Sequence, residues 1–103
     1  MEITVTPQGQ EARIEVFGSI DERGAEEMKR RFLELDLPSV KEVVFDFRGV
    51  TFIGSAGIGK LLLLYKNVAA QGGKVRIDNM SKDIYTMFKV VKLDKIFSIS
   101  PAK

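Results

Sequence analysis

Apolar residues recur along this chain at two spacings, every second residue and every third or fourth residue, which predict strands and helices respectively. Alternation within residues 3–5 and 12–16, on either side of the turn-forming segment 7–10, predicts a β-hairpin. A first helix is predicted behind Asp21 as its N-cap, and it should end before Pro38. The residues at helical spacing that should face the core are Ala25, Met28, Phe32 and Leu35.

The middle of the chain predicts a buried strand followed by a second helix. Residues 43–47 are β-branched or aromatic on both faces apart from Asp46, as in a strand at the centre of a sheet. A glycine-rich segment, 54–59, comes next, and Gln71-Gly72-Gly73 stops the helix that follows. The apolar positions of this helix are Ile58, Leu61, Leu62, Tyr65, Val68 and Ala69.

The last third of the chain predicts a strand, a helix and a short final strand. Residues 74–78 alternate as a strand, Ser81 caps the next helix, and residues 96–99 form the last strand. The inward positions of this helix are Ile84, Met87, Phe88 and Val91. The order is β-β-α-β-α-β-α-β with short connections, which predicts a single α/β domain over residues 1–103, a mixed β-sheet with helices packed on it.

Composition narrows the chemistry. The chain has no Cys and no His, so it lacks a thiol nucleophile, a thiolate or imidazole metal ligand, and the usual general base at neutral pH. We therefore expect no enzyme activity, no metal and no cofactor. The charges of the acidic and basic residues nearly cancel, so we expect no nucleic-acid partner. The N-terminus lacks a signal-peptide pattern and the longest apolar run, Leu61–Leu64, is too short to span a bilayer, so we expect a cytoplasmic protein with no membrane partner.

The glycine-rich segment has one interpretation as a phosphate-binding loop. Residues 54–60, Gly-Ser-Ala-Gly-Ile-Gly-Lys, match the first seven positions of the nucleotide P-loop pattern between a strand and a helix. Leu61 stands where that pattern needs a Ser or Thr hydroxyl for Mg²⁺. A nucleotide-binding protein is therefore only a remote alternative.

The same segment resembles the signature of the STAS domain of bacterial anti-sigma-factor antagonists. Residues 43–59 follow that pattern, in which a buried strand leads into an Asp-Ser-x-Gly-Leu-Gly helix start. Gly18-Ser19-Ile20-Asp21 resembles the family's turn before its first helix, and Gly72-Gly73 resembles its exit from the second. Gly54 occupies the position where the family usually carries aspartate.

The resemblance implies a partner-switching protein. Such a protein binds an anti-sigma factor that is also a serine kinase and so releases a sigma factor for transcription, while phosphorylation, reversed by a phosphatase, prevents binding. Carried over by position, the phosphoacceptor is Ser55. The partner-binding residues implied are Asp21, Gly54, Ser55, Ala56, Gly57 and Ile58.

Other interpretations of these residues stay open. Ser55 is also suited to be a plain N-cap of the second helix, and Asp21 a plain N-cap of the first. Gly57 and Gly59 would let a partner backbone approach closely, and Lys60 and Lys66 would form a solvated face. STAS-like domains also serve as interaction or scaffold subunits of regulatory and transport complexes, which is the second functional alternative.

Overall fold

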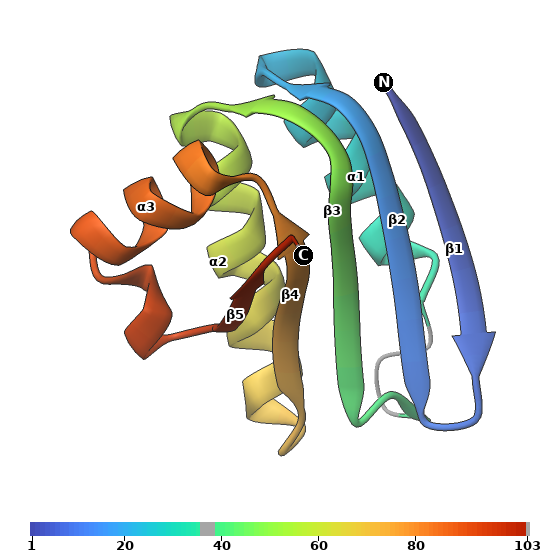
Figure 1. Cartoon of the computed structure of the whole chain (residues 1–103). Helices are drawn as coiled ribbons and strands as arrows, with labels where there is room; N and C mark the ends of the chain where they lie inside the picture. Colours follow the sequence, from blue (N-terminus) through green and yellow to red (C-terminus); the bar gives the residue numbers. More distant parts are fainter. Residues whose placement is uncertain (36–38, 103) are drawn as a thin grey trace.

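A five-stranded sheet forms the centre of the molecule, and the computed structural model describes residues 1–35 and 39–102 (Figure 1). The strands lie in the order β1-β2-β3-β4-β5, with β1 antiparallel to β2 and every other pair parallel. Their bounds are β1 Glu2–Gln8, β2 Glu11–Ile20, β3 Glu42–Ile53, β4 Lys74–Met80 and β5 Ser98–Pro101. The predicted hairpin and the central position of the strand containing residues 43–47 are both confirmed.

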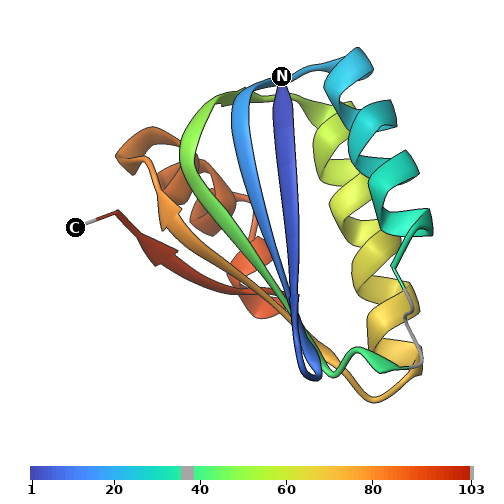
Figure 2. The same ribbon diagram turned by 90° about the vertical axis from the view of Figure 1, so that its right-hand side faces the viewer.

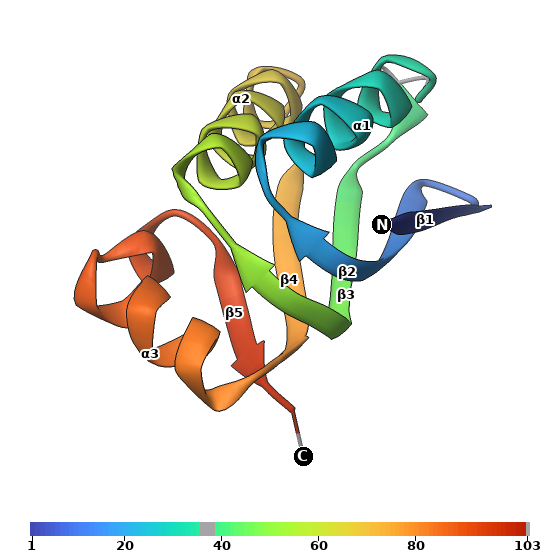
Figure 3. The ribbon, with the colours of Figure 1, turned by 90° about the horizontal axis from the view of Figure 1, so that it is seen from above.

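The helices follow the predicted order. Helices α1 (Glu22–Leu33) and α2 (Ser55–Ala70) lie side by side on one face of the sheet (Figure 2). Helix α3 (Lys82–Val90) and the short 3₁₀ helix η2 (Leu93–Lys95) lie beside the β5 edge (Figure 3). The α/β class, the mixed sheet and the order of elements are thus confirmed.

Two groups of aromatic side chains join the helices to the sheet. Phe45 on β3 packs edge-on against Phe32 of α1 and Phe47, with ring centroids 5.7 and 6.0 Å apart. Near the β5 edge, Phe97 contacts Tyr65 of α2 at 5.7 Å. Phe97 also packs against Phe88 of α3, with centroids 6.5 Å apart. One continuous core therefore links all three helices to the sheet.

The structure corrects the sequence predictions at the carboxyl-terminal ends of α1 and α3 and at the start of the last strand. Helix α1 ends at Leu33, so Leu35 packs against the core from beyond the helix, while Pro38 lies outside the described residues. Helix α3 ends at Val90, and Val91, predicted to face inward, is 53% exposed. The predicted strand 96–99 begins only at Ser98, because η2 takes up the preceding turn.

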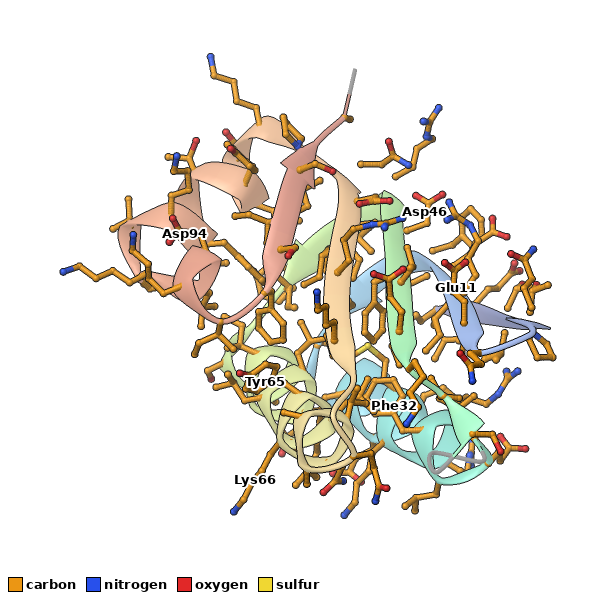
Figure 4. All side chains as sticks on the ribbon, turned by 90° about the horizontal axis from the view of Figure 1, so that it is seen from below. Glu11, Phe32, Asp46, Tyr65, Lys66 and Asp94 are labelled. Atoms are coloured by element: carbon orange, nitrogen blue, oxygen red, sulfur yellow. The ribbon has the colours of Figure 1, made fainter. Side chains whose placement is uncertain are left out.

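The face of the sheet opposite α1 and α2 carries polar side chains, and Asp46 lies at the centre of one cluster there (Figure 4). Its carboxylate accepts hydrogen bonds from the Arg13 guanidinium at 3.0 Å, the Arg48 backbone N–H at 3.0 Å and the Asn79 amide at 3.1 Å. Partial burial raises the pKa of Asp46, but these three partners lower it by more, so the pKa lies below its ordinary value of 3.8.

This lowered pKa predicts a pH-dependent contribution to stability. A carboxylate with a lower pKa in the folded chain stabilises the fold above the unfolded pKa, about 3.9, and the stabilisation is lost as the pH falls through the folded value. We expect Asp46→Asn to lower the melting temperature at pH 7, and the difference from wild type to shrink below about pH 4. Thermal unfolding followed by circular dichroism from neutral to acidic pH measures this, and a difference that stays constant over the range would contradict it.

Candidate functional site

The candidate site lies where β2 and β3 end side by side. Ile20 pairs with Ile53 at the carboxyl ends of these parallel strands, and the Gly54 N–H donates to the Ile20 carbonyl at 3.1 Å. Helices α1 and α2 begin directly after these positions, so both first turns lie at the same edge of the sheet (Figure 1). The fold thus brings Asp21 and Ser55 to one edge, although they are far apart in sequence.

Ser55 is the first residue of α2 and is exposed. The N-cap is Gly54, which has an extended backbone and no side chain to cap the helix, so the interpretation of Ser55 as the N-cap is wrong by one position. Within residues 1–35 and 39–102, the Ser55 hydroxyl makes no hydrogen bond. It is therefore accessible and not engaged in holding the helix start.

The first turn of α2 presents backbone donors close to this hydroxyl. The first bond of the helix runs from the Ile58 N–H to the Gly54 carbonyl at 3.1 Å, so the N–H groups of residues 55–57 have no acceptor within the helix. These groups and the positive end of the helix dipole favour negative charge at this position. A phosphate on Ser55 would therefore be compatible with the folded helix.

Asp21 has the capping role that its sequence position suggested. Its side chain accepts a hydrogen bond from the Gly24 N–H at 2.8 Å, which places Asp21 as the N-cap of α1. The residue as a whole is exposed beside the start of α2. Partner contact by Asp21 stays a prediction that is compatible with this exposure.

Gly57 and Gly59 have different surroundings in α2. Gly57 is buried, and a Cβ there would lie 2.6 Å from Ile20 Cγ2 and 2.9 Å from Ile53 Cγ1. Its missing side chain therefore allows the helix to pack closely on the ends of β2 and β3. Gly59 is exposed, and a Cβ there would have nothing within 4 Å. The open approach expected for both glycines is present at Gly59, whereas the space beside Gly57 is filled by the chain itself.

The other two predicted partner-binding residues lie partly at the surface. Ala56 lines a shallow groove between α1 and α2, together with Gly59 and Lys60. Ile58 is half-buried and packs against the core, so only part of its side chain is available to a partner. Phosphorylation of Ser55 and the partner contacts at this edge remain predictions.

Two features of the site were not found from the sequence. Phe52 is 52% exposed, and its ring lies against Gly54, with two ring atoms 3.3 Å from where a Cβ on Gly54 would stand. Lys60 forms an ion pair with Glu26 at 3.2 Å, linking α2 to α1 rather than belonging to a purely solvated face. The sequence of the mostly apolar segment 50–53 did not show that Phe52 is exposed, and the ion pair joins residues distant in sequence.

The geometry does not fit a nucleotide P-loop. That motif needs a loop of backbone N–H groups ahead of the helix, whereas residues 55–60 are already the first turns of α2. Lys60, the residue that would reach the phosphates, is paired with Glu26. The nucleotide-binding alternative therefore has no support in the structure. No metal-binding group of acidic side chains occurs among the described residues, and none of their helices is long and apolar enough to cross a membrane.

The sequence profile of the STAS domain matches residues 3–103. The chain belongs to the STAS domain family. Among curated relatives, it is 28% identical to a STAS-domain containing protein of Pseudomonas aeruginosa, over 97% of this chain and all of that protein. It is 22% identical to the anti-sigma-B factor antagonist of Bacillus subtilis, over 95% of this chain and 89% of the relative.

Solved structures agree with the STAS assignment at the level of the fold. An anti-sigma factor antagonist from Mycobacterium paratuberculosis has a TM-score of 0.83 and 22% identity, with 97% of this chain and 85% of the other covered. The Bacillus protein SpoIIAA in its phosphorylated form has a TM-score of 0.76 and 18% identity, with 95% and 90% covered. This STAS domain therefore shares the architecture of anti-sigma-factor antagonists over nearly its whole length.

Proposed function

We propose that this STAS domain is an anti-sigma-factor antagonist, which binds an anti-sigma factor at the edge formed by Asp21 and the first turn of α2. One observation carries the proposal: Ser55 stands exposed at the first position of α2, with its hydroxyl unbonded within the described chain. The anti-sigma-B factor antagonist and the phosphorylated SpoIIAA among its relatives support the same role. Anti-sigma-factor antagonists of the STAS family are in general not enzymes.

Phosphorylation of Ser55 would act on the surface rather than on the fold. A phosphoserine adds roughly 1.5 to 2 negative charges at neutral pH. The free N–H groups of the α2 first turn can donate hydrogen bonds to the phosphate, so the helix can stay folded. A partner that covers this edge would have to desolvate the phosphate, and its acidic groups would be repelled by it. Both effects weaken binding. The proposed kinase is the anti-sigma factor itself, and a phosphatase acting on phosphoserine would restore binding in the cytoplasm.

Gly54 gives this chain a distinct version of the switch. A carboxylate at this position would cap α2, which has no side-chain cap, and would stand directly before the acceptor serine. The backbone of Gly54 has φ −101°, which any residue adopts, and the Phe52 ring would need to move by only a few tenths of an ångström. Gly54→Asp should therefore fold and should be phosphorylated faster than the natural chain.

The proposal predicts a loss of partner binding on modification of Ser55. Wild type, Ser55→Ala and Gly54→Asp are incubated with ATP and each candidate anti-sigma kinase of the source organism, followed by intact-mass analysis. One added phosphate is expected on wild type and Gly54→Asp only. Isothermal titration should then show binding weakened by about 10- to 100-fold, on the order of 1.4–2.8 kcal/mol. Ser55→Ala, unmodified, should bind like unmodified wild type, and phosphate on Ser55→Ala or unchanged affinity after modification would contradict the switch.

A second candidate is a STAS interaction subunit that is never phosphorylated. The observation that favours it is the absence of a carboxylate at position 54, next to the acceptor serine. Such a subunit would bind its partner constitutively in a regulatory or transport complex. Binding to a candidate partner without any added phosphate, even for Gly54→Asp, would support this alternative.

A further inference from the structure

Residues 89–96, which we call the α3–η2 corner, expose aliphatic side chains that the core does not use. Val90 is 73% exposed, Val91 53% and Ile96 38%. Leu93 is the one apolar side chain of this segment that is buried. The corner projects from the body of the molecule beyond α2, on the side away from β1 (Figures 1 and 3). Exposed aliphatic groups gathered in one segment indicate a surface that is covered in another setting.

The turn that builds this corner is tight. Lys92 adopts a left-handed backbone, φ 64°, which ends α3 and starts η2. The Lys95 N–H then donates to the Lys92 carbonyl at 3.2 Å, and the Ile96 and Phe97 N–H groups donate to Leu93 at 3.1 and 2.9 Å. The end of α3 and the whole of η2 are thereby held together as one ordered projection.

The same corner carries the chain's excess positive charge. It contains Lys89, Lys92 and Lys95 against one acid, Asp94, a balance equal to the +2 of the entire chain. In the described part of the chain none of these lysines forms an ion pair, and the Lys89 ammonium lies over the Tyr85 ring, 5.6 Å from its centroid. Figure 4 places Asp94 at this corner, on the opposite side of the molecule from Glu11 and β1. These exposed ammonium groups are therefore not neutralised by carboxylates of the described chain.

We propose that the α3–η2 corner docks on an anionic lipid surface. Aliphatic side chains that enter the interface between head groups and acyl chains, surrounded by lysines whose long stems let the ammonium reach the lipid phosphates, are the combination that peripheral membrane contacts use. The sequence led us to expect no membrane partner, because it contains no segment that could span a bilayer. Surface docking needs only this corner.

The occupant is a bilayer rather than an acidic polymer because of the aliphatic residues. Heparin-like chains and nucleic acids attract lysines, but they offer no apolar phase for Val90, Val91 and Ile96. The corner also lacks an exposed aromatic side chain that could stack on a base. The lysines therefore match the anionic head-group region of a bilayer, and the exposed aliphatic side chains match its acyl-chain region.

The test is co-sedimentation of the full chain with vesicles of phosphatidylcholine alone and of phosphatidylcholine containing phosphatidylglycerol. Binding is expected to the anionic vesicles only and should fall at high salt. Each lysine near an anionic surface raises the partition coefficient onto the vesicles by about fivefold. Replacing Lys89, Lys92 and Lys95 by Gln should therefore lower partitioning by about a hundredfold. The matched control replaces Lys41, Lys66 and Lys74 by Gln, which removes the same charge elsewhere and should retain most of the binding.

A second pair of variants tests the aliphatic part. Val90 and Leu33 are each the last residue of a helix and are 73% and 75% exposed. Val90→Asp should reduce binding to the anionic vesicles several-fold, whereas Leu33→Asp should not. Absence of binding to anionic vesicles, equal loss in the two lysine triples, or full binding by Val90→Asp would each overturn the proposal. The last outcome would indicate a purely electrostatic contact that does not use the aliphatic side chains.

Discussion

Replacing Phe45 by alanine is expected to lower the free energy of unfolding by about 3–5 kcal/mol. Phe45 is fully buried on the central strand and contacts the rings of Phe32 and Phe47, so its removal leaves a cavity between α1 and the sheet. Neighbouring strands and helices hold the walls of that cavity apart, which limits its collapse. Urea unfolding of both proteins, followed by circular dichroism, measures the difference.

Phe17→Ala is the matched control for this substitution. Phe17 is an aromatic residue on the adjacent strand β2, but it is 43% exposed and lies over Gly49 on the opposite face of the sheet. Its truncation should cost about 1 kcal/mol or less. If the two variants lost similar stability, the packing described between α1 and β3 would be wrong.

Gly57→Ala is expected to cost about 1–3 kcal/mol of unfolding free energy through overpacking. The higher helix propensity of alanine offsets about 1 kcal/mol of this cost. The added Cβ would overlap Ile20 and Ile53, whose branched side chains are confined at the ends of their strands. The first turn of α2 must then move away from the sheet. Because Ser55 belongs to this turn, Gly57→Ala should also slow the phosphorylation that we propose for Ser55.

Gly59→Ala provides the contrast within the same helix. No atom lies within 4 Å of the added Cβ, so the helix gains propensity without strain and should be stabilised by up to about 1 kcal/mol. Chemical denaturation of both variants, combined with the kinase assay, separates the two effects. Equal stability for Gly57→Ala and Gly59→Ala would exclude a close contact between α2 and Ile20.

The fold was largely predictable because its local signals agree with one another. Three sequence patterns predict burial on the sides that the structure buries. They are the alternation in the first two strands, the helical spacing of Met28 and Phe32, and the segment 43–47, which is apolar on both faces apart from Asp46. Asp21 and Ser81 begin their helices as predicted, each accepting a hydrogen bond from a backbone N–H three residues later. Periodicity and capping act over a few residues, and the sequence alone therefore reveals them.

Prediction failed where a turn competes with periodicity. Val91 continues the helical spacing of α3, but the left-handed backbone at Lys92 ends the helix and leaves Val91 in solvent. A lysine gives no signal for such a conformation, which glycine usually adopts. The same turn and the 3₁₀ helix after it delay the last strand to Ser98.

The position of the helix start at the candidate site was predictable from the sequence, but its contacts were not. The glycine-rich helix start was visible as a motif, while the alternative interpretation of Ser55 as the cap was wrong by one residue because Gly54, which has no side chain, occupies the N-cap position. The packing of Gly57 on Ile20 and the link between Lys60 and Glu26 join residues more than thirty positions apart. Contacts of this kind depend on tertiary structure and leave no local pattern in the sequence.

The order of the strands has a consequence for how the chain acquires its structure. Each strand lies next to the strand that precedes it in the sequence, from β1 at one edge to β5 at the other. The sheet can therefore grow at a single edge as the chain leaves the ribosome, without waiting for a late segment to insert between strands already paired. The connections are a hairpin turn between β1 and β2, one helix between β2 and β3 and between β3 and β4, and α3 with η2 between β4 and β5, so the entropic cost of each loop closure stays small. Segments later in the sequence of the domain, the α3–η2 corner and β5, then complete a sheet whose centre is already assembled.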